Sequence, residues 1–178
     1  MDDSGEIFDV VDSQDQVIGQ ATRGEVHARG LLHRAVHILV FDSEGNLFLQ
    51  KRAWTKDENP GFWDTSAAGH VNAGEDYRTC AHRELREELG ISENLEFSTK
   101  FTAGPETLWE HVEVYYCSTD QKITPNPREI TDGRFWSPDD LKKAVEERSG
   151  RFTSTFLLIF DCLLKTKGSR FKLLEKGI

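Results

Sequence analysis

The first half of the chain alternates short apolar runs with polar turns, a pattern typical of strands. The segment Asp42–Gly45 is expected to form a tight turn, so the runs on either side of it are expected to pair as a hairpin. A polar loop is expected at residues 53–61. The predicted strands or extended segments in this half are residues 6–10, 16–22, 34–41, 46–51 and 62–68.

A helix is predicted after residue 76, where the apolar spacing changes. Ala81, Leu85 and Leu89 recur at i, i+4 and i+8, and we expect them to form the face that packs on the core. Asp76 is a good N-cap, and Gly90 suits the left-handed residue that follows a helix. The sequence therefore predicts one helix between these two residues.

The second half of the chain predicts more strands and two further helices. Ser137 followed by proline and acidic residues is expected to begin a helix that runs to about residue 147. The strongly apolar helix predicted at 153–165 is expected to pack Phe156, Phe160, Leu163 and Leu164 on the sheet. This order of elements predicts an α+β fold in a single domain over residues 1–178, with a mixed β-sheet between helices. The strands expected in this half lie at about 95–103, 108–118 and 130–136.

Composition limits the classes of partner and location. The chain has 22 basic and 31 acidic residues, a net charge of −9, so we expect no nucleic acid partner. Three widely spaced cysteines suggest neither a disulfide framework nor a metal knuckle. We find no signal-peptide pattern and no apolar run of membrane-spanning length, which predicts a cytoplasmic protein with no membrane partner.

Three glutamates are grouped on the predicted helix. Glu84, Glu87 and Glu88 are spaced i, i+3 and i+4, so their side chains share one face. Such a face is most often simply solvated, with pairs such as Arg83–Glu87. The alternative is a cation site, because hard divalent ions such as Mg²⁺ prefer carboxylate oxygens.

The residues around these glutamates favour the cation site. Residues 69–91 match the Nudix box, G-x5-E-x7-R-E-U-x-E-E-x-G-U, at every constrained position, where U is a bulky aliphatic residue. The stretch resembles an intact box of the Nudix hydrolases. That resemblance implies an α/β/α sandwich and a hydrolase, dependent on Mg²⁺ or Mn²⁺, that cleaves a diphosphate linked to another moiety of nucleotide or prenyl type. The matching positions are Gly69, Glu75, Arg83, Glu84, Leu85, Glu87, Glu88, Gly90 and Ile91.

The resemblance also implies roles for these residues. Glu84, Glu87 and Glu88 are expected to bind the metal, with Glu75 supporting the same site. A carboxylate must take the proton of the attacking water, and Glu87 and Glu88 are the candidates. Arg83 is expected to act in catalysis by orienting Glu87 through a charge-assisted hydrogen bond.

Residues 10–70 resemble the N-terminal half of type-1 isopentenyl diphosphate isomerase, itself a protein of Nudix fold. In that family three histidines and two glutamates bind a divalent metal, which implies a second metal site here at His27, His33 and His70. Glu113 is the best match to one glutamate, and His111 or Glu110 would have to serve for the other. Basic residues bind the diphosphate in the isomerase, and Arg52 and Lys56 match two of them, although an ordinary polar loop is an equal alternative.

One departure from the isomerase pattern decides the preferred function. Where the isomerase has a catalytic cysteine before the Gly-His pair, this chain has Ala68, which cannot transfer a proton. The isomerase also has a degraded Nudix box, whereas the box here is complete. We therefore expect a hydrolase that acts on a small-molecule diphosphate. The alternatives are an isopentenyl diphosphate isomerase and a non-catalytic Nudix-fold binding module.

A few other residues are candidates for contact with substrate. Trp54 lies between Arg52 and Lys56 and is the tryptophan expected to reach the substrate, while core packing is favoured for the other three. Glu129 is either a carboxylate near the site or a surface residue. A homodimer is left open by the sequence.

Overall fold

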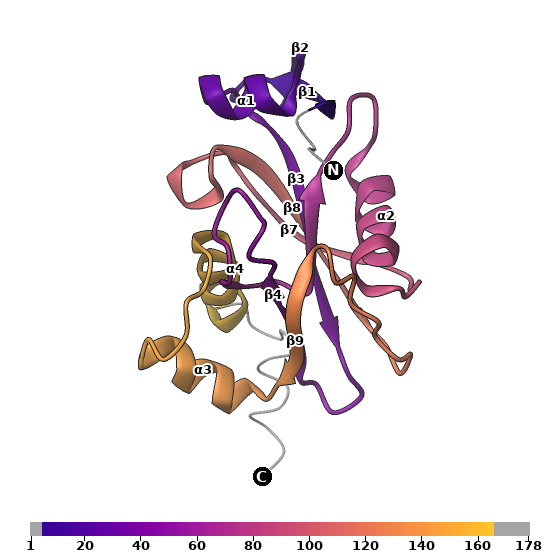
Figure 1. Ribbon diagram of the computed structural model, residues 1–178, viewed down its shortest axis with the longest axis vertical. Coiled ribbons are helices and arrows are strands. Elements are labelled where there is room, and N and C mark those ends of the chain that lie inside the picture. The colour runs from indigo at the N-terminus through magenta and orange to yellow at the C-terminus, as the bar shows by residue number, and fades with distance from the viewer. Residues whose placement is uncertain (1–4, 166–178) are drawn as a thin grey trace.

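The computed structural model describes residues 5–165, which contain a mixed seven-stranded sheet covered by helices on both faces (Figure 1). The α+β sandwich expected from the sequence is confirmed. The expectation of one domain over 1–178 includes residues 1–4 and 166–178, which lie outside the described residues. The sheet consists of β3 (His33–Phe41), β4 (Leu47–Arg52), β5 (Trp63–Asp64), β6 (Ala67–His70), β7 (Glu96–Phe101), β8 (Glu110–Ser118) and β9 (Ile130–Trp136).

Strand β3 is central to the sheet and separates two apolar cores. It pairs in parallel with β8 along its whole length, and its side chains alternate between the two faces. On one face lie α3 (Pro138–Glu146) and α4 (Ser154–Lys165), with Phe156 and Phe160 in the core. On the other face lies α2 (Tyr77–Leu89), whose Leu85 and Leu89 are fully buried as expected. Among residues 5–165, no helix has the length and apolar character needed to cross a membrane.

A separate two-stranded sheet at the N-terminus carries a helix that the sequence analysis missed. Strands β1 (Ile7–Val11) and β2 (Val17–Thr22) pair antiparallel, and α1 (Arg23–Arg29) follows directly. The side chain of Thr22 accepts a hydrogen bond from the amide of Glu25, whose own side chain accepts from the amide of Thr22, and Gly30 ends the helix at φ 61°. This capping box with its terminal glycine was the signal in the sequence.

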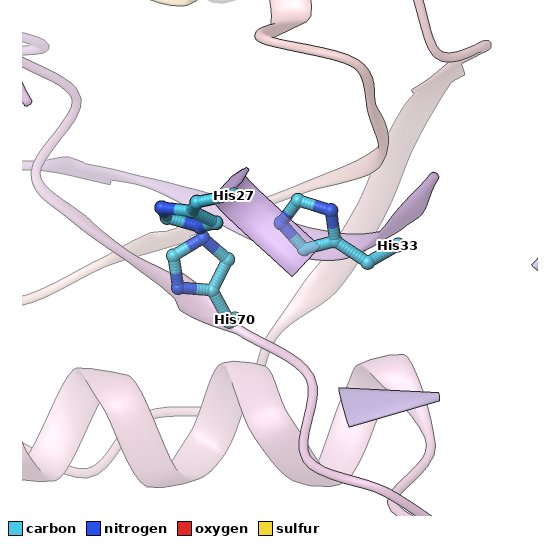
Figure 2. A group of neighbouring side chains, drawn as sticks. All are labelled: His27, His33 and His70. Carbon is cyan, nitrogen blue, oxygen red and sulfur yellow. The ribbon is translucent and has the colours of Figure 1, made fainter. Parts of the chain in front are cut away.

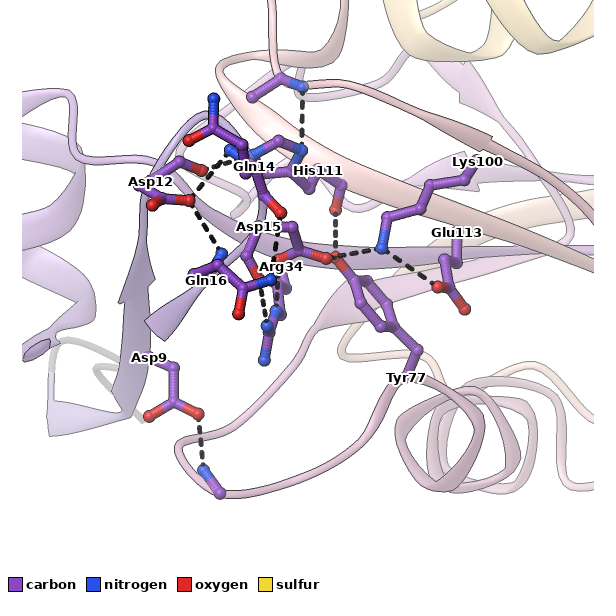
Figure 3. Close-up of polar contacts among 12 residues, drawn as sticks. Asp9, Asp12, Gln14, Asp15, Gln16, Arg34, Tyr77, Lys100, His111 and Glu113 are labelled. Atoms are coloured by element: carbon purple, nitrogen blue, oxygen red, sulfur yellow. Dashed lines mark hydrogen bonds and ion pairs between the residues drawn. The ribbon is translucent and has the colours of Figure 1, made fainter. Parts of the chain in front are cut away.

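The turn between β1 and β2 is attached to the central sheet through Asp15. Its carboxylate accepts hydrogen bonds from Arg34 Nε at 2.6 Å, from Lys100 Nζ at 2.5 Å and from the Tyr77 hydroxyl at 2.9 Å (Figure 3). These donors come from β3, β7 and the start of α2. Asp15 therefore helps to fix the position of the N-terminal sheet and of α1, together with contacts such as that of His111 with the carbonyl of Asp12.

The hairpin expected across the turn at Asp42–Gly45 is confirmed, but its two strands soon diverge. β3 pairs with β4 only at Val40 and Phe41. Nearer the start of β3, at residues 35–38, the partner of β3 is β6 instead. The segment 62–68, expected to be one extended piece, is accordingly divided between β5 on β4 and β6 on β3. Because β4 turns away from β3 and β6 takes its place, the central sheet opens between β4 and β6, next to α2.

Candidate active site

A cavity of about 290 Å³ lies where the sheet opens, between β6, the ends of β4 and β8, and helix α2. Its lining is mostly polar and includes residues from Glu6 to Thr155. The metal-binding candidates that reach it are Glu84, Glu87, Glu88, His70 and Glu110.

The three glutamates of α2 differ in their surroundings. Glu84 and Glu88 are buried, whereas the side chain of Glu87 is 58% exposed at the rim of the cavity. Glu88 Oε2 accepts hydrogen bonds from Gln50 Nε2 at 2.9 Å and from the Ala68 amide at 3.0 Å. Two of the three carboxylates are therefore buried, which excludes the interpretation of this helix face as fully solvated.

Gly69 makes room for one of these carboxylates. A Cβ placed on Gly69 would lie 2.1 Å from both Cδ and Oε1 of Glu84. The backbone of Gly69 is therefore in close contact with this carboxylate, and steric space explains the glycine at the first position of the box.

The two buried carboxyl groups are electrostatically unfavourable without a cation. Burial raises the pKa of Glu84, and the nearby Glu88 raises it further, although Arg83 opposes both effects. Burial also raises the pKa of Glu88, with Glu129 adding to the effect. A divalent ion would relieve this destabilisation, and the oxygen donors suit a hard cation, so the residues present fit a bound Mg²⁺ or Mn²⁺.

Arg83 has different main partners from the one expected. Its Nε and Nη2 atoms donate to the two oxygens of Glu75 at 3.0 and 2.9 Å, and its Nη1 lies 2.5 Å from Glu84 Oε1. The expected contact with Glu87 is present but longer, at 3.3 Å. Glu75 does not line the cavity. Its carboxylate positions Arg83, which in turn orients Glu84, and a further role of Glu75 in supporting the ion stays a prediction.

His27, His33 and His70 form a compact cluster (Figure 2), of which His70 also lines the cavity. They come from α1, β3 and β6, and one ligand nitrogen from each lies within 4.8 Å of the others. Segments far apart in the sequence therefore bring three potential nitrogen ligands together, as the resemblance to the isomerase implied.

The carboxylate that joins this cluster is Glu110. Its Oε1 lies 2.9 Å from His70 Nε2 and 3.3 Å from His33 Nε2. The expectation that Glu113 completes the cluster is wrong, because an odd number of positions along a strand places it on the opposite face from Glu110. There Glu113 contacts Lys100 Nζ at 3.3 Å and the Tyr115 hydroxyl at 2.6 Å. His111 is also on that face and binds the carbonyl of Asp12.

The ring of His33 leaves one nitrogen for a cation. Its Nδ1 lies 3.0 Å from the carbonyl oxygen of Leu31 and must donate, because a carbonyl can only accept. Its Nε2 is buried and has no hydrogen-bond partner of acceptable geometry among the described residues. Burial alone would lower the pKa of His33, but the carboxylate of Glu110 raises it overall. A proton or a metal ion at this nitrogen satisfies the same geometry, so these residues fit a second divalent ion.

The predicted substrate contacts are only partly brought together. Arg52 and Lys56 line the cavity, where Arg52 Nη1 lies 3.4 Å from Asp64 and Lys56 forms an ion pair with Glu129. Glu129 lines the same cavity, which resolves its two readings in favour of the site. Trp54 does not line it: the residue is 68% exposed and its ring packs over Gly61, so its contact with substrate stays a prediction that the cavity lining does not support.

Sequence reasoning missed a group of buried polar residues at the inner end of the cavity. They are His37, Asp64, Thr153 and Thr155. A polar residue inside the apolar run of β3 was the signal for His37, since burying an imidazole requires partners. Nothing local in the sequence indicated that Thr153, at the start of α4, donates to Asp64 at 3.0 Å.

The residue that replaces the catalytic cysteine of the isomerase pattern, Ala68, lies at the cavity. Ala68 lines the cavity, where its amide binds Glu88, and its side chain supplies no group for proton transfer. Cys80 does not substitute for it, because its thiol donates to the carbonyl of His70 and is not part of the cavity lining.

Comparison with known proteins places this site in a family. The NUDIX domain model matches residues 31–156. The chain is 38% identical over 166 residues to an isopentenyl-diphosphate Delta-isomerase of Serratia proteamaculans, covering 89% of this chain and 91% of the relative. It is 39% identical over 137 residues to an uncharacterized Nudix hydrolase of Pseudomonas aeruginosa, covering 75% and 80%.

A solved structure agrees with the family match. The crystal structure of DR0079 from Deinococcus radiodurans superposes with a TM-score of 0.76 at 26% identity and covers 88% of this chain and 99% of that one. The sheet, the complete box on α2 and these relatives lead to one conclusion: the chain is a member of the Nudix superfamily and resembles type-1 isopentenyl diphosphate isomerase.

Proposed function

We propose that this protein is a divalent-metal-dependent hydrolase that cleaves a phosphoanhydride bond in a diphosphate linked to another group. The observation that carries the proposal is the pair of buried carboxylates, Glu84 and Glu88, which line a cavity together with the more exposed Glu87. Such a pair of buried carboxylates destabilises the fold unless a cation is present. A bound diphosphate is also negatively charged, so the same cation would neutralise both the carboxylates and the substrate. Members of the Nudix superfamily generally use divalent metal ions, which supports this reading.

The other charged residues of the cavity have roles that follow from their positions. When bound, the metal neutralises phosphate oxygens and lowers the pKa of water. Arg52 and Lys56 supply positive charge for the diphosphate, and each is oriented by a carboxylate, Asp64 for Arg52 and Glu129 for Lys56. A proton from the attacking water passes to a carboxylate at the cavity, for which Glu87, Glu88 and Glu129 are the candidates.

The test is product release from a panel of diphosphates with Mg²⁺ or Mn²⁺. We expect release of phosphate or of a nucleoside monophosphate from the wild-type protein, and a loss of about 100-fold or more in Glu88→Gln, because a neutral amide is a poor ligand for a hard cation. Glu146→Gln is the control, since Glu146 is an exposed glutamate of α3. Equal activity in Glu88→Gln and the control would exclude the proposed role of the α2 carboxylates.

A second candidate function is isomerisation of isopentenyl diphosphate. The cluster of His27, His33, His70 and Glu110 favours it, as does the similarity to the Serratia proteamaculans protein. Ala68 opposes it, because the position carries no proton donor or acceptor. We expect no conversion of isopentenyl diphosphate into dimethylallyl diphosphate by nuclear magnetic resonance. Conversion at a rate above that of hydrolysis would reverse the order of the two candidates.

Several expectations from the sequence remain predictions alongside this proposal. They are a cytoplasmic location, a small-molecule substrate, no nucleic acid or membrane partner, and an open choice between monomer and homodimer. The reducing cytoplasm is consistent with Cys80, which is a buried thiol.

A further inference from the structure

A second groove, of about 450 Å³, is lined mainly by residues of β9 and α3, on the face of the sheet opposite α2. Strand β9 passes into α3 through Ser137 alone (Figure 1). Among the described residues, the groove shares no lining residue with the cavity beside α2, so the proposed hydrolysis gives its side chains no role. The aromatic and basic residues of its lining are Trp63, Phe135, Trp136, Arg134 and Lys143.

Arg134 contacts aromatic rings in this groove and no carboxylate. The central carbon of its guanidinium lies 3.8 Å from the centroid of the Trp136 ring and 5.6 Å from that of Trp63. Over residues 5–165, the exposed side chain of Arg134 forms no ion pair and no hydrogen bond. A guanidinium that rests on a ring keeps its N–H groups available for a planar oxyanion, which it can bind through two parallel hydrogen bonds.

Lys143 adds a second cation without a partner. It is exposed on α3, and its ammonium group forms no ion pair with any carboxylate in the described part of the chain. Two acidic residues, Asp140 and Glu147, also line the groove. Asp140 Oδ2 already accepts a hydrogen bond from the Ser137 hydroxyl at 2.8 Å, in the first turn of α3, where the helix dipole stabilises it. The groove thus presents two uncompensated cations, opposed by the exposed carboxylate of Glu147.

The indole N–H of Trp136 is a third donor that lacks an acceptor. The residue is 8% exposed, and its Nε1 atom is buried with no hydrogen-bond partner within residues 5–165. The one other buried side-chain atom of this kind among the described residues is His33 Nε2, at the histidine cluster. A buried N–H without an acceptor is destabilising, and folded proteins rarely keep one without a reason. An oxygen bound by Arg134, which lies over the same ring, would satisfy this donor once the exposed Arg134 side chain shifts.

We propose that this groove is a second ligand site, which binds the oxyanion of a small organic acid: a carboxylate or phosphate monoester attached to a planar apolar ring. The three groups without a partner, Arg134, Lys143 and the Trp136 N–H, are all donors, which suits an oxyanion and excludes a cation. The groove is too large for a bare ion, and Trp63 and the 37% exposed Phe135 offer apolar surface to the attached ring. The site does not depend on the reaction carried out beside α2.

The experiment follows the indole N–H signals of the full-length protein with Mg²⁺ by proton–nitrogen NMR. The chain has four tryptophans, and Trp136→Phe, which keeps an aromatic ring in the core, identifies the signal of Trp136. Benzoate and phenyl phosphate are expected to move this signal downfield with a Kd of about 1 mM or below, because Nε1 gains an acceptor. Benzamide, an uncharged analogue of benzoate, should leave the signal in place. The acid with the lower Kd shows which oxyanion the groove prefers.

Charge variants test which side chains bind the probe. Arg134→Gln is expected to raise the Kd for benzoate by about tenfold or more, and Lys143→Gln by about threefold. Glu147→Gln is expected to lower this Kd by about twofold, because it removes the negative charge that opposes the ligand. Lys142→Gln is the matched control, since Lys142 is an exposed lysine of α3 that does not line the groove. All four positions are exposed, and the Trp136 signal without ligand reports whether each variant is folded.

Three results would overturn the proposal. If benzamide moves the Trp136 signal as far as benzoate does, the groove does not recognise charge. If the Kd in Arg134→Gln stays within about twofold of that in Lys142→Gln, the guanidinium over the ring does not bind the ligand. If the Trp136 signal stays in place up to about 20 mM of either acid, the groove is not a site for them, even where the same acids bind at the cavity beside α2.

Discussion

The carboxylate of Glu84 fills the space that a side chain at Gly69 would need, since a Cβ on Gly69 would lie 2.1 Å from Glu84 Cδ. Gly69→Ala is therefore expected to displace this carboxylate and to lower kcat by about 100-fold, as misplacement of a site group by about 1 Å does elsewhere. Steady-state kinetics on a hydrolysed diphosphate measures it. Gly19→Ala is the control, because a Cβ on Gly19 meets nothing within 4 Å. Equal activity of the two variants would mean that Glu84 can move without consequence.

Metal-free protein is expected to lose stability as the pH rises. The pKa values of Glu84 and Glu88 are raised in the folded state by burial, so the folded chain retains protons that the unfolded chain releases above the ordinary glutamate value of 4.5. Stability then falls with rising pH from that value upward through the raised pKa values. Denaturant unfolding in EDTA at about pH 5 and about pH 8 measures the slope.

Neutralising either carboxylate removes this penalty. Glu84→Gln and Glu88→Gln are each expected to stabilise the metal-free protein at about pH 8 by about 1–3 kcal/mol, and to abolish the stabilisation that added Mg²⁺ gives to the wild type. The exposed Glu146→Gln should change neither quantity. Metal-free variants less stable than the wild type at this pH would contradict the reading that these carboxylates await a cation.

Glu110 and Glu113 offer a paired test of the histidine cluster. Glu110 contacts His33 and His70, whereas Glu113, on the opposite face of the sheet, contacts Lys100 and Tyr115. Glu110→Gln is expected to weaken Co²⁺ binding at the histidines by about 10- to 100-fold, while Glu113→Gln leaves it within about twofold. Visible absorption of bound Co²⁺ reports coordination by the imidazoles. The reverse order of effects would restore Glu113 as the ligand.

Asp15 is expected to stabilise the N-terminal sheet through its charge. Asp15→Asn weakens the bonds from Arg34 and Lys100 and is expected to lower the free energy of unfolding by about 1–3 kcal/mol. Asp161→Asn removes a surface pair with Lys165 and should cost less than about 0.5 kcal/mol. Denaturant unfolding measures both.

The effect of Asp15 should also depend on pH. Burial alone would raise its pKa, but hydrogen bonds from Lys100, Arg34 and Tyr77 lower it overall. The stabilisation is therefore present above the ordinary value of 3.8 and is lost as the pH falls below it toward the folded-state pKa. A difference between the wild type and Asp15→Asn that stays constant down to about pH 2 would show that the charge of Asp15 is not the cause.

Local rules account for the elements that the sequence predicted well. Helix α2 begins after Asp76 and ends before Gly90 because a side chain caps one end and a left-handed glycine the other. The same rules, applied to Thr22, Glu25 and Gly30, would have found α1. The segment 62–68 was read as one piece because its division depends on which strand, β3 or β4, is the partner of each half.

The sequence by itself determined the order of strands and helices, the grouping of the glutamates on one helix, and the absence of a proton-transfer group at Ala68. These depend on spacing along the chain, which a helix or strand converts directly into a shared face. Only the tertiary structure decided that Glu110 and not Glu113 joins the histidines, that Glu75 serves Arg83, and that His37 meets Asp64. The contacts of Glu110 and of His37 join segments tens of residues apart, whereas Glu75 and Arg83 are eight residues apart on a loop and a helix. Side-chain alternation, strand register and burial select among partners that are equivalent in the sequence alone.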